Sequence, residues 1–116
     1  MSPPTDYQKR IFDSAYTFRK ETHMYVDILP AYNKFEIECG IKEDEVFDIL
    51  PKFYGMRLSL DPDSDLDDDA VILLENLKKK GYYIGKRAIG YDYEHTKLAI
   101  QAMARFHALG MGIKYK

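Results

Sequence analysis

The chain has 116 residues, of which 46% are hydrophobic, 17 are basic and 19 are acidic. This composition is ordinary for a globular domain and too apolar for a disordered chain. The formal net charge of −2 gives the chain as a whole no attraction to nucleic acid or to anionic lipid, and no arginine-rich run is present. We therefore expect neither a nucleic-acid partner nor a membrane partner.

A cytoplasmic location is expected from three features of the sequence. Cys39 is the single cysteine, so no internal disulfide can form, which fits a reducing compartment. The first six residues are polar and contain two prolines, unlike a secretory signal. The longest apolar run, Ala70–Leu74, is far shorter than the roughly 20 residues that a membrane span needs.

Helical periodicity dominates the N-terminal third of the chain. After possible N-caps at Thr5 and Asp6, apolar positions recur at steps of three and four from Tyr7 to Leu29, which predicts about six turns of helix. Pro30 is expected to end or kink this helix, because proline lacks an amide hydrogen. A shorter helix is expected over Ala31–Glu38, with Gly40 as its C-terminal cap.

Two strands and a last helix are expected in the remainder. Lys52–Leu60 is rich in aromatic residues and alternates as a strand does, whereas Ala70–Leu74 is a continuous apolar run typical of a strand buried on both faces. The aspartate-rich residues 61–69 between them predict an antiparallel hairpin with a long solvated turn. Residues 78–91 are expected to be loop, and Asp92 to cap a helix that ends at Gly110.

These elements place the chain in the α+β class. A two-stranded hairpin with helices on one side buries little apolar surface and is a poor core on its own. The order of elements therefore makes more sense as the interior of a larger fold.

No metal site is predicted from these residues. Asp61, Asp63 and Asp65 match the first three ligand positions of an EF-hand loop, but Leu66 stands where glycine is needed and Ile72 where a bidentate glutamate is needed. A solvated turn is the favoured interpretation of the aspartates. The glycines of Gly81–Arg87 have the wrong spacing for a phosphate-binding loop, and the three histidines have no liganding spacing.

Glu21 is a candidate site residue because of its place on the first helix. It follows Phe18 by three residues and precedes Tyr25 by four, so it lies close to the apolar face. A carboxylate so close to a buried face needs a cationic partner or must reach water. From spacing alone, a solvated glutamate at the edge of the apolar face is the favoured interpretation.

Three segments, in the right order, resemble the ecdysteroid kinase-like family, also called CHK kinase-like. Phe18–Pro30 is similar to the family's Phe-x-x-Glu-x-x-x-Tyr-x-x-x-x-Pro helix. Leu50–Gly55 and Val71–Leu77 resemble its proline-led strand and its Val-Leu-x-Leu-Glu-Asp-Leu strand and hinge, with Asn76 in place of the aspartate. Gly81, Tyr82 and Arg87, followed by Tyr91–Gly110, resemble its Leu-x-x-Glu-His helix ending in Leu-Ala-x-Phe-His-Ala, with Met103-Ala104 in place of Leu-Ala.

The resemblance implies a partial protein-kinase-like fold made of the small-lobe helix, two antiparallel strands, the hinge and the first large-lobe helix. Residues 1–74 would belong to the small lobe, 75–80 to the hinge and 81–116 to the start of the large lobe. Glu21 would be the helix glutamate that pairs with the ATP-contacting lysine. Glu75, Asn76 and Leu77 would contact the adenine edge of ATP at the hinge, and the loop after Gly81 would lead toward the substrate side.

The family implies phosphate transfer from ATP, with Mg²⁺, to a hydroxyl of a small molecule that is ecdysteroid-like or choline-like. The nucleotide lysine would precede this chain, and the catalytic and metal-binding aspartates would follow it. We therefore expect a kinase fragment that is inactive by itself. The alternative is a short non-enzymatic protein that binds a partner through the first helix, using Ile11, Phe18, Tyr25 and Leu29.

Overall fold

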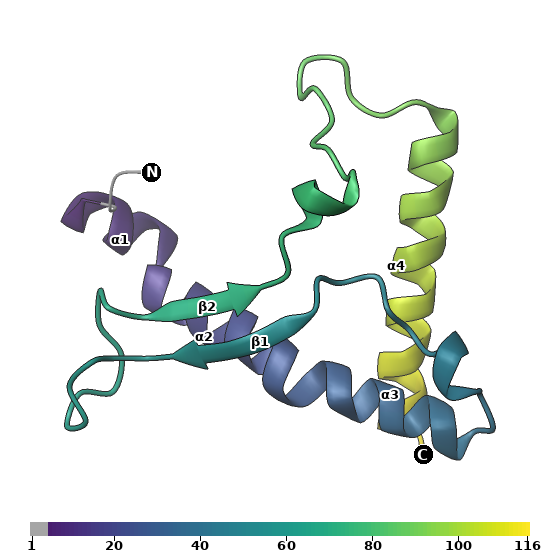
Figure 1. Cartoon of the computed structure of the whole chain (residues 1–116), viewed down its shortest axis with the longest axis horizontal. Helices are drawn as coiled ribbons and strands as arrows, with labels where there is room; N and C mark the ends of the chain where they lie inside the picture. Colours follow the sequence, from purple (N-terminus) through teal and green to yellow (C-terminus); the bar gives the residue numbers. More distant parts are fainter. Residues whose placement is uncertain (1–4) are drawn as a thin grey trace. The chain divides into compact units, whose positions relative to one another are not determined.

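A computed structural model describes residues 5–116, apart from the side chains of Lys9, Ile11 and Phe12. These residues form two compact units, one made of residues 5–29 and Lys52–Leu74, the other of Pro30–Pro51 and Glu75–Lys116. Helices and one two-stranded antiparallel sheet confirm the α+β class. Along the chain the elements are α1 (Asp6–Phe12), α2 (Ser14–His23), the π-helix η1 (Met24–Ile28), α3 (Leu29–Glu38), the 3₁₀ turn η2 (Glu43–Glu45), β1 (Phe53–Arg57), β2 (Val71–Leu74), the 3₁₀ turn η3 (Leu77–Lys80) and α4 (Tyr93–Lys114) (Figure 1).

The first helix is interrupted where the sequence predicts continuity. Asp13 has a left-handed backbone, with φ of 43°, and separates α1 from α2. Its carboxylate accepts a hydrogen bond from the Tyr16 amide at 3.4 Å, which caps α2. Aspartate tolerates this conformation better than most residues because its short polar side chain bonds locally to the backbone.

Pro30 does not end the helical path, and that part of the prediction is wrong. Between Met24 and Ile28 the backbone widens to a π-helix, in which the Leu29 amide donates to the Met24 carbonyl, five residues earlier. Pro30 is then the second residue of α3, in a first turn where its missing amide hydrogen is not needed. The C-terminal end of α3 is as predicted. Gly40 has φ of 90°, and the Ile41 amide donates a hydrogen bond to the Glu36 carbonyl at 3.0 Å.

The predicted antiparallel hairpin is confirmed. Phe53 pairs with Leu74 and Arg57 with Val71, and the register shifts between Phe53 and Gly55. The expectation that the second strand is buried on both faces is wrong, because Leu73 is 58% exposed. Val71, two residues earlier on the same face of β2, is exposed as well.

The long turn of the hairpin is held by polar contacts. The Arg57 guanidinium donates to the Asp69 carbonyl at 2.9 and 3.1 Å, and Ser59 donates to the Asp67 carboxylate. An ion pair of 2.5 Å between Arg19 and Asp65 connects α2 to the same turn. The aspartates therefore act as turn and ion-pair residues within the first unit.

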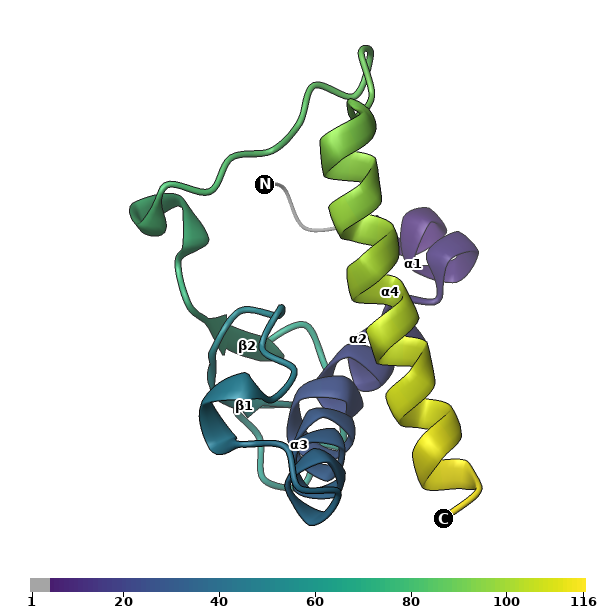
Figure 2. The same ribbon diagram turned by 90° about the vertical axis from the view of Figure 1, so that its right-hand side faces the viewer.

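In the second unit, α4 packs against α3 through two glycines. A Cβ on Gly110 would lie 2.7 Å from the Tyr32 hydroxyl oxygen, and a Cβ on Gly112 would lie 2.7 Å from the Phe35 ring. The prediction that α4 ends at Gly110 is wrong, because the helix continues to Lys114. Figure 2 shows the C-terminal half of α4 passing close to α3.

Aromatic rings and a buried carboxylate make the small core of this unit. The Phe106 ring lies 5.3 Å from Tyr32 and 5.9 Å from Phe47, centroid to centroid, and Phe47 is almost fully buried. Glu36 of α3 is only 4% exposed. It accepts 2.7 Å hydrogen bonds from the Phe47 amide and from the Arg105 guanidinium of α4.

None of the helices described over residues 5–116 is long and apolar enough to cross a lipid bilayer.

Candidate functional site

Glu21 lies near the C-terminal end of α2, with its side chain exposed. Together with Ser14, Thr17 and Phe18 it lines a shallow hollow of about 220 Å³ on the surface of the first unit. Among the described residues no cation forms an ion pair with Glu21. The carboxylate is therefore available to a cationic group from outside these residues.

Tyr25 fixes the helix that carries Glu21 onto the sheet. Its ring stacks on that of Phe53 in β1, with 5.6 Å between centroids and 9° between planes. Burial, and secondly the negative charge of Glu21, raise the pKa of the Tyr25 hydroxyl. Because Tyr25 is half-buried against β1, it is poorly placed to serve as the free binding face that the non-enzymatic alternative requires. The side chain of Ile11, another member of that face, lies outside the described residues.

The raised pKa of Tyr25 predicts a loss of stability in alkaline solution. The unfolded tyrosine ionises at its ordinary value of 10.0, while the folded one stays neutral to higher pH, so stability falls as pH rises above that value. Unfolding free energies of wild type and Tyr25→Phe, measured by urea denaturation from neutral to alkaline pH, should show this. The phenylalanine variant should lose less stability on alkalinisation, and equal losses in both proteins would contradict the assignment.

The hinge candidates Glu75, Asn76 and Leu77 directly follow β2, at the boundary between the two compact units. The Asn76 side chain accepts from the Lys78 amide at 3.1 Å and so caps η3. Glu75 is paired with Lys80 at 2.5 Å. Leu77 is the first residue of η3, so its amide hydrogen has no acceptor within that turn.

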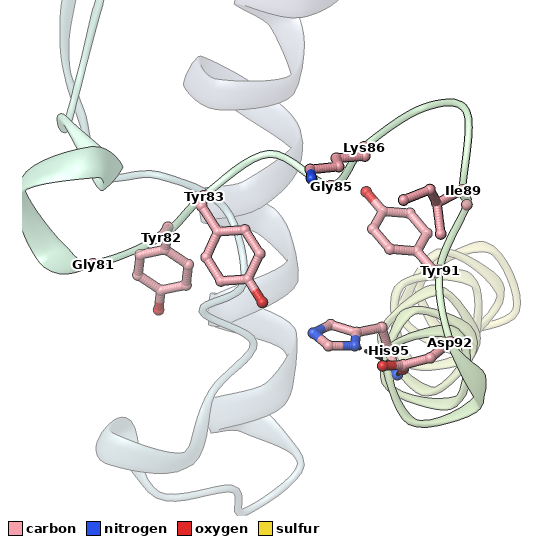
Figure 3. Close-up of a pocket in the computed structure, with 10 residues that line it drawn as sticks. Gly81, Tyr82, Tyr83, Gly85, Lys86, Ile89, Tyr91, Asp92 and His95 are labelled. Carbon is pink, nitrogen blue, oxygen red and sulfur yellow. Dashed lines mark hydrogen bonds and ion pairs between the residues drawn. The ribbon is translucent and has the colours of Figure 1, made fainter.

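A tyrosine-rich hollow follows the hinge in the second unit. It has a volume of about 490 Å³ and is formed by the loop before α4 and the first turn of that helix. Figure 3 shows Tyr82 and Tyr83 on one side and Tyr91 and His95 on the other, with Lys86 on the stretch that joins them. The hollow thus combines aromatic walls with one ammonium group.

Local contacts shape this loop. A Cβ on Gly85 would lie 2.8 Å from the Tyr91 ring, so only glycine at this position lets the ring lie so close to the backbone. The Tyr91 ring stacks on His95 with 6.3 Å between centroids. The Asp92 carboxylate accepts from the His95 amide at 2.9 Å and contacts the His95 ring at 2.7 Å, and these contacts lower the pKa of Asp92. The N-cap predicted at Asp92 is therefore confirmed.

The sequence predicted a loop here but did not predict the hollow. The three glycines and three tyrosines within residues 81–91 are the signal that could have indicated it. In the part of the chain that the structure describes, no three His, Cys, Asp or Glu side chains come together in a way that could hold a metal ion. Cys39 is exposed.

A comparison with models of protein families establishes the family of this chain. The model of the ecdysteroid kinase-like family matches residues 1–116. The chain belongs to the ecdysteroid kinase-like family. The resemblance seen in the sequence motifs is thereby confirmed, and the helices with a two-stranded sheet are consistent with part of a kinase-like fold. No curated protein and no solved structure matches the chain.

Membership of the ecdysteroid kinase-like family indicates kinase-like phosphotransferase chemistry in general terms. The two sets of candidate residues belong to different compact units, Glu21 to the first and Glu75–Leu77 to the second.

Proposed function

We propose that this chain supplies part of the nucleotide site of an ATP-dependent kinase that phosphorylates a hydroxyl of a small molecule. In this proposal residues 1–74 belong to the small lobe, 75–80 form the hinge and 81–116 begin the large lobe. The acceptor is ecdysteroid-like or choline-like, as the family implies. The observation that carries the proposal is the amide of Leu77, which has no acceptor within η3 and lies three residues after the end of β2, in a chain of this family.

The hinge residues fit the edge of an adenine ring. An amide hydrogen at the start of a helical turn has no internal acceptor and can donate to a ring nitrogen. A neighbouring backbone carbonyl can accept from an exocyclic amino group. When ATP is bound, it supplies the phosphoryl group, and the role of Glu75, Asn76 and Leu77 is to orient its base.

Glu21 would act on the phosphates indirectly, by holding a lysine. Its carboxylate is exposed and unpaired by any described cation, which suits an ion pair with a lysine from another strand. The stacking of Tyr25 on Phe53 keeps this helix on the sheet. The described residues form no metal cluster, so Mg²⁺ would be held by other residues of the kinase.

Binding of ATP to the hinge can be tested with a proline at position 77. Asn76 has φ of −81° and ψ of 92°, an extended conformation that a following proline accepts, and proline suits the first position of a helical turn. Leu77→Pro therefore removes the amide hydrogen with little strain. We expect it to weaken ATP binding about fivefold relative to Leu77→Ala, the worth of one neutral hydrogen bond of about 1 kcal/mol.

The measurement is an NMR titration of the 116-residue chain with ATP, following the amides of residues 75–80. Leu77→Ala is the matched control, because it loses the same side chain but keeps the amide. Equal affinity of the two variants, or ATP-induced shifts that miss these residues, would sink the hinge assignment.

Phosphate transfer by the 116-residue polypeptide alone is expected to be undetectable. Transfer depends on a lysine at the phosphates and on a metal-binding aspartate with its catalytic partners. Neither motif of the family occurs within residues 1–116. A purified sample, free of contaminating kinase, that converts ATP to ADP with any alcohol acceptor would overturn this prediction.

A further inference from the structure

The charge of the chain is unevenly distributed. Residues 76–91, here called the basic loop, contain five basic side chains and no acidic one: Lys78, Lys79, Lys80, Lys86 and Arg87. The other residues carry 12 basic and 19 acidic side chains, a net charge of −7. The overall charge of −2, which gives no expectation of lipid binding, therefore hides a local charge of +5. Such asymmetry is typical of a surface that meets a polyanion.

The cations of the basic loop are mostly available. Lys80 is paired with Glu75 at 2.5 Å. Among residues 5–116, no ion pair occupies Lys78, Lys79, Lys86 or Arg87, and these four side chains are exposed. The two carboxylates that flank the loop have partners elsewhere: Glu75 pairs with Lys80, and Asp92 accepts from the His95 amide at the N-cap of α4.

Large apolar side chains in the same loop are turned to solvent. Ile84 is 84% exposed, Tyr83 is 80% exposed and Ile89 is 77% exposed. In both ribbon views the loop runs from η3 to the start of α4 without another helix or strand of its unit alongside (Figures 1 and 2). The contacts of Gly85 and Asp92 with their neighbours give the loop a defined shape.

We propose that the basic loop is a docking surface for an anionic lipid bilayer, a role beyond the proposed kinase function, although the hinge residues Asn76 and Leu77 lie at its start. Basic side chains are attracted to anionic headgroups, and tyrosines favour the interface between headgroups and acyl chains. The exposed isoleucines favour lipid over nucleic acid, because an aliphatic side chain cannot stack on a base as an aromatic ring does. Ile84 and Ile89 enter the interfacial layer while Lys86 and Arg87 contact headgroups.

The test is a vesicle-partition experiment with the whole 116-residue chain. We expect binding to vesicles made of equal parts phosphatidylcholine and phosphatidylserine, and much weaker binding to phosphatidylcholine alone. Lys86→Gln with Arg87→Gln should lower the partition coefficient about 25-fold, since each basic residue near an anionic surface contributes about fivefold. Lys34→Gln with Lys42→Gln is the matched control, because it removes two exposed lysines of the same unit outside the loop and should change partition little.

A second variant separates lipid docking from simple attraction between charges. Ile84→Ser keeps every charge and should still weaken binding to the mixed vesicles, whereas it should leave binding of a single-stranded oligonucleotide unchanged. Circular dichroism of each variant checks that the helices are retained. Equal binding to both vesicle types, or equal loss in the control and loop variants, would overturn the proposal. A different result would overturn the lipid proposal and identify a nucleic-acid surface instead: the chain binds the oligonucleotide more tightly than the vesicles, and Ile84→Ser leaves vesicle binding unchanged.

Discussion

Replacing Arg105 with methionine is expected to lower the free energy of unfolding by roughly 2–3 kcal/mol. The Arg105 guanidinium donates at 2.7 Å to Glu36, whose side chain is 4% exposed. Without this partner, the buried carboxylate keeps only the Phe47 amide as a donor from the chain. This loss of unfolding free energy is smaller than that for breaking a fully buried ion pair. The Arg105 side chain is 44% exposed, so water can hydrogen-bond to Glu36 in part when the guanidinium is removed.

Methionine is chosen so that the loss concerns charge and not packing. The Arg105 guanidinium lies 5.8 Å from the centre of the Phe47 ring, and a methionine side chain can cover part of that ring. Its other bond, to the Glu45 carbonyl at 2.5 Å, is lost as well, but that carbonyl lies in an exposed turn and can bond to water.

A second ion pair in the same unit, between the C-terminal Lys116 and Glu38 at the end of α3, supplies the control. Lys116 pairs with Glu38 at the surface, so Lys116→Met should change stability little, because exposed pairs are screened by water. Urea unfolding followed by circular dichroism measures both variants. The double change Arg105→Met with Glu36→Gln removes the stranded charge and should recover part of the loss. A loss in Arg105→Met no larger than in Lys116→Met would show that the buried pair is not important for stability.

The sequence predicted correctly those elements that are set by interactions between residues close together in the chain. Asp92 caps α4 and Gly40 closes α3 because each bonds to backbone groups within a few residues. The hairpin was predictable because two β-forming runs flank a polar turn. Asp13 was missed, because one left-handed residue leaves the periodicity of its neighbours unchanged. Of the two outcomes expected at Pro30, an end or a kink, the end is wrong because a π-helix just before it allows the helical path to continue.

The partnership of Glu36 could not be predicted from spacing. Glu36 and Arg105 are 69 positions apart, and nothing in either helix marks one as the partner of the other. Glu21 and Glu75–Leu77 became candidates because motifs in the correct order resembled a family, and the match over residues 1–116 confirms that family. Their roles stay predictions. The tyrosine-rich hollow depends on loop geometry, which composition does not determine.

Gly112 shows how a helix glycine can be required by a neighbour. A Cβ there would lie 2.7 and 2.9 Å from two atoms of the Phe35 ring, closer than side chains pack without movement. Alanine is otherwise the better helix residue, by up to about 1 kcal/mol. We therefore expect Gly112→Ala to destabilise the wild type, because displacing the ring costs more than the gain in helix propensity.

The same substitution should become stabilising once the ring is gone. Leucine at position 35 lacks the outer ring atoms that meet the added methyl group, so Gly112→Ala in a Phe35→Leu background should show only the gain in propensity. The coupling between the two changes is expected to be about 1–2 kcal/mol. Tyr32→Phe is the control background, because the Tyr32 hydroxyl approaches Gly110 and not Gly112. Urea denaturation of the four proteins in each cycle measures the coupling. Equal coupling in both backgrounds would mean that α3 and α4 do not meet through this glycine, and close packing of the second unit would then need another cause.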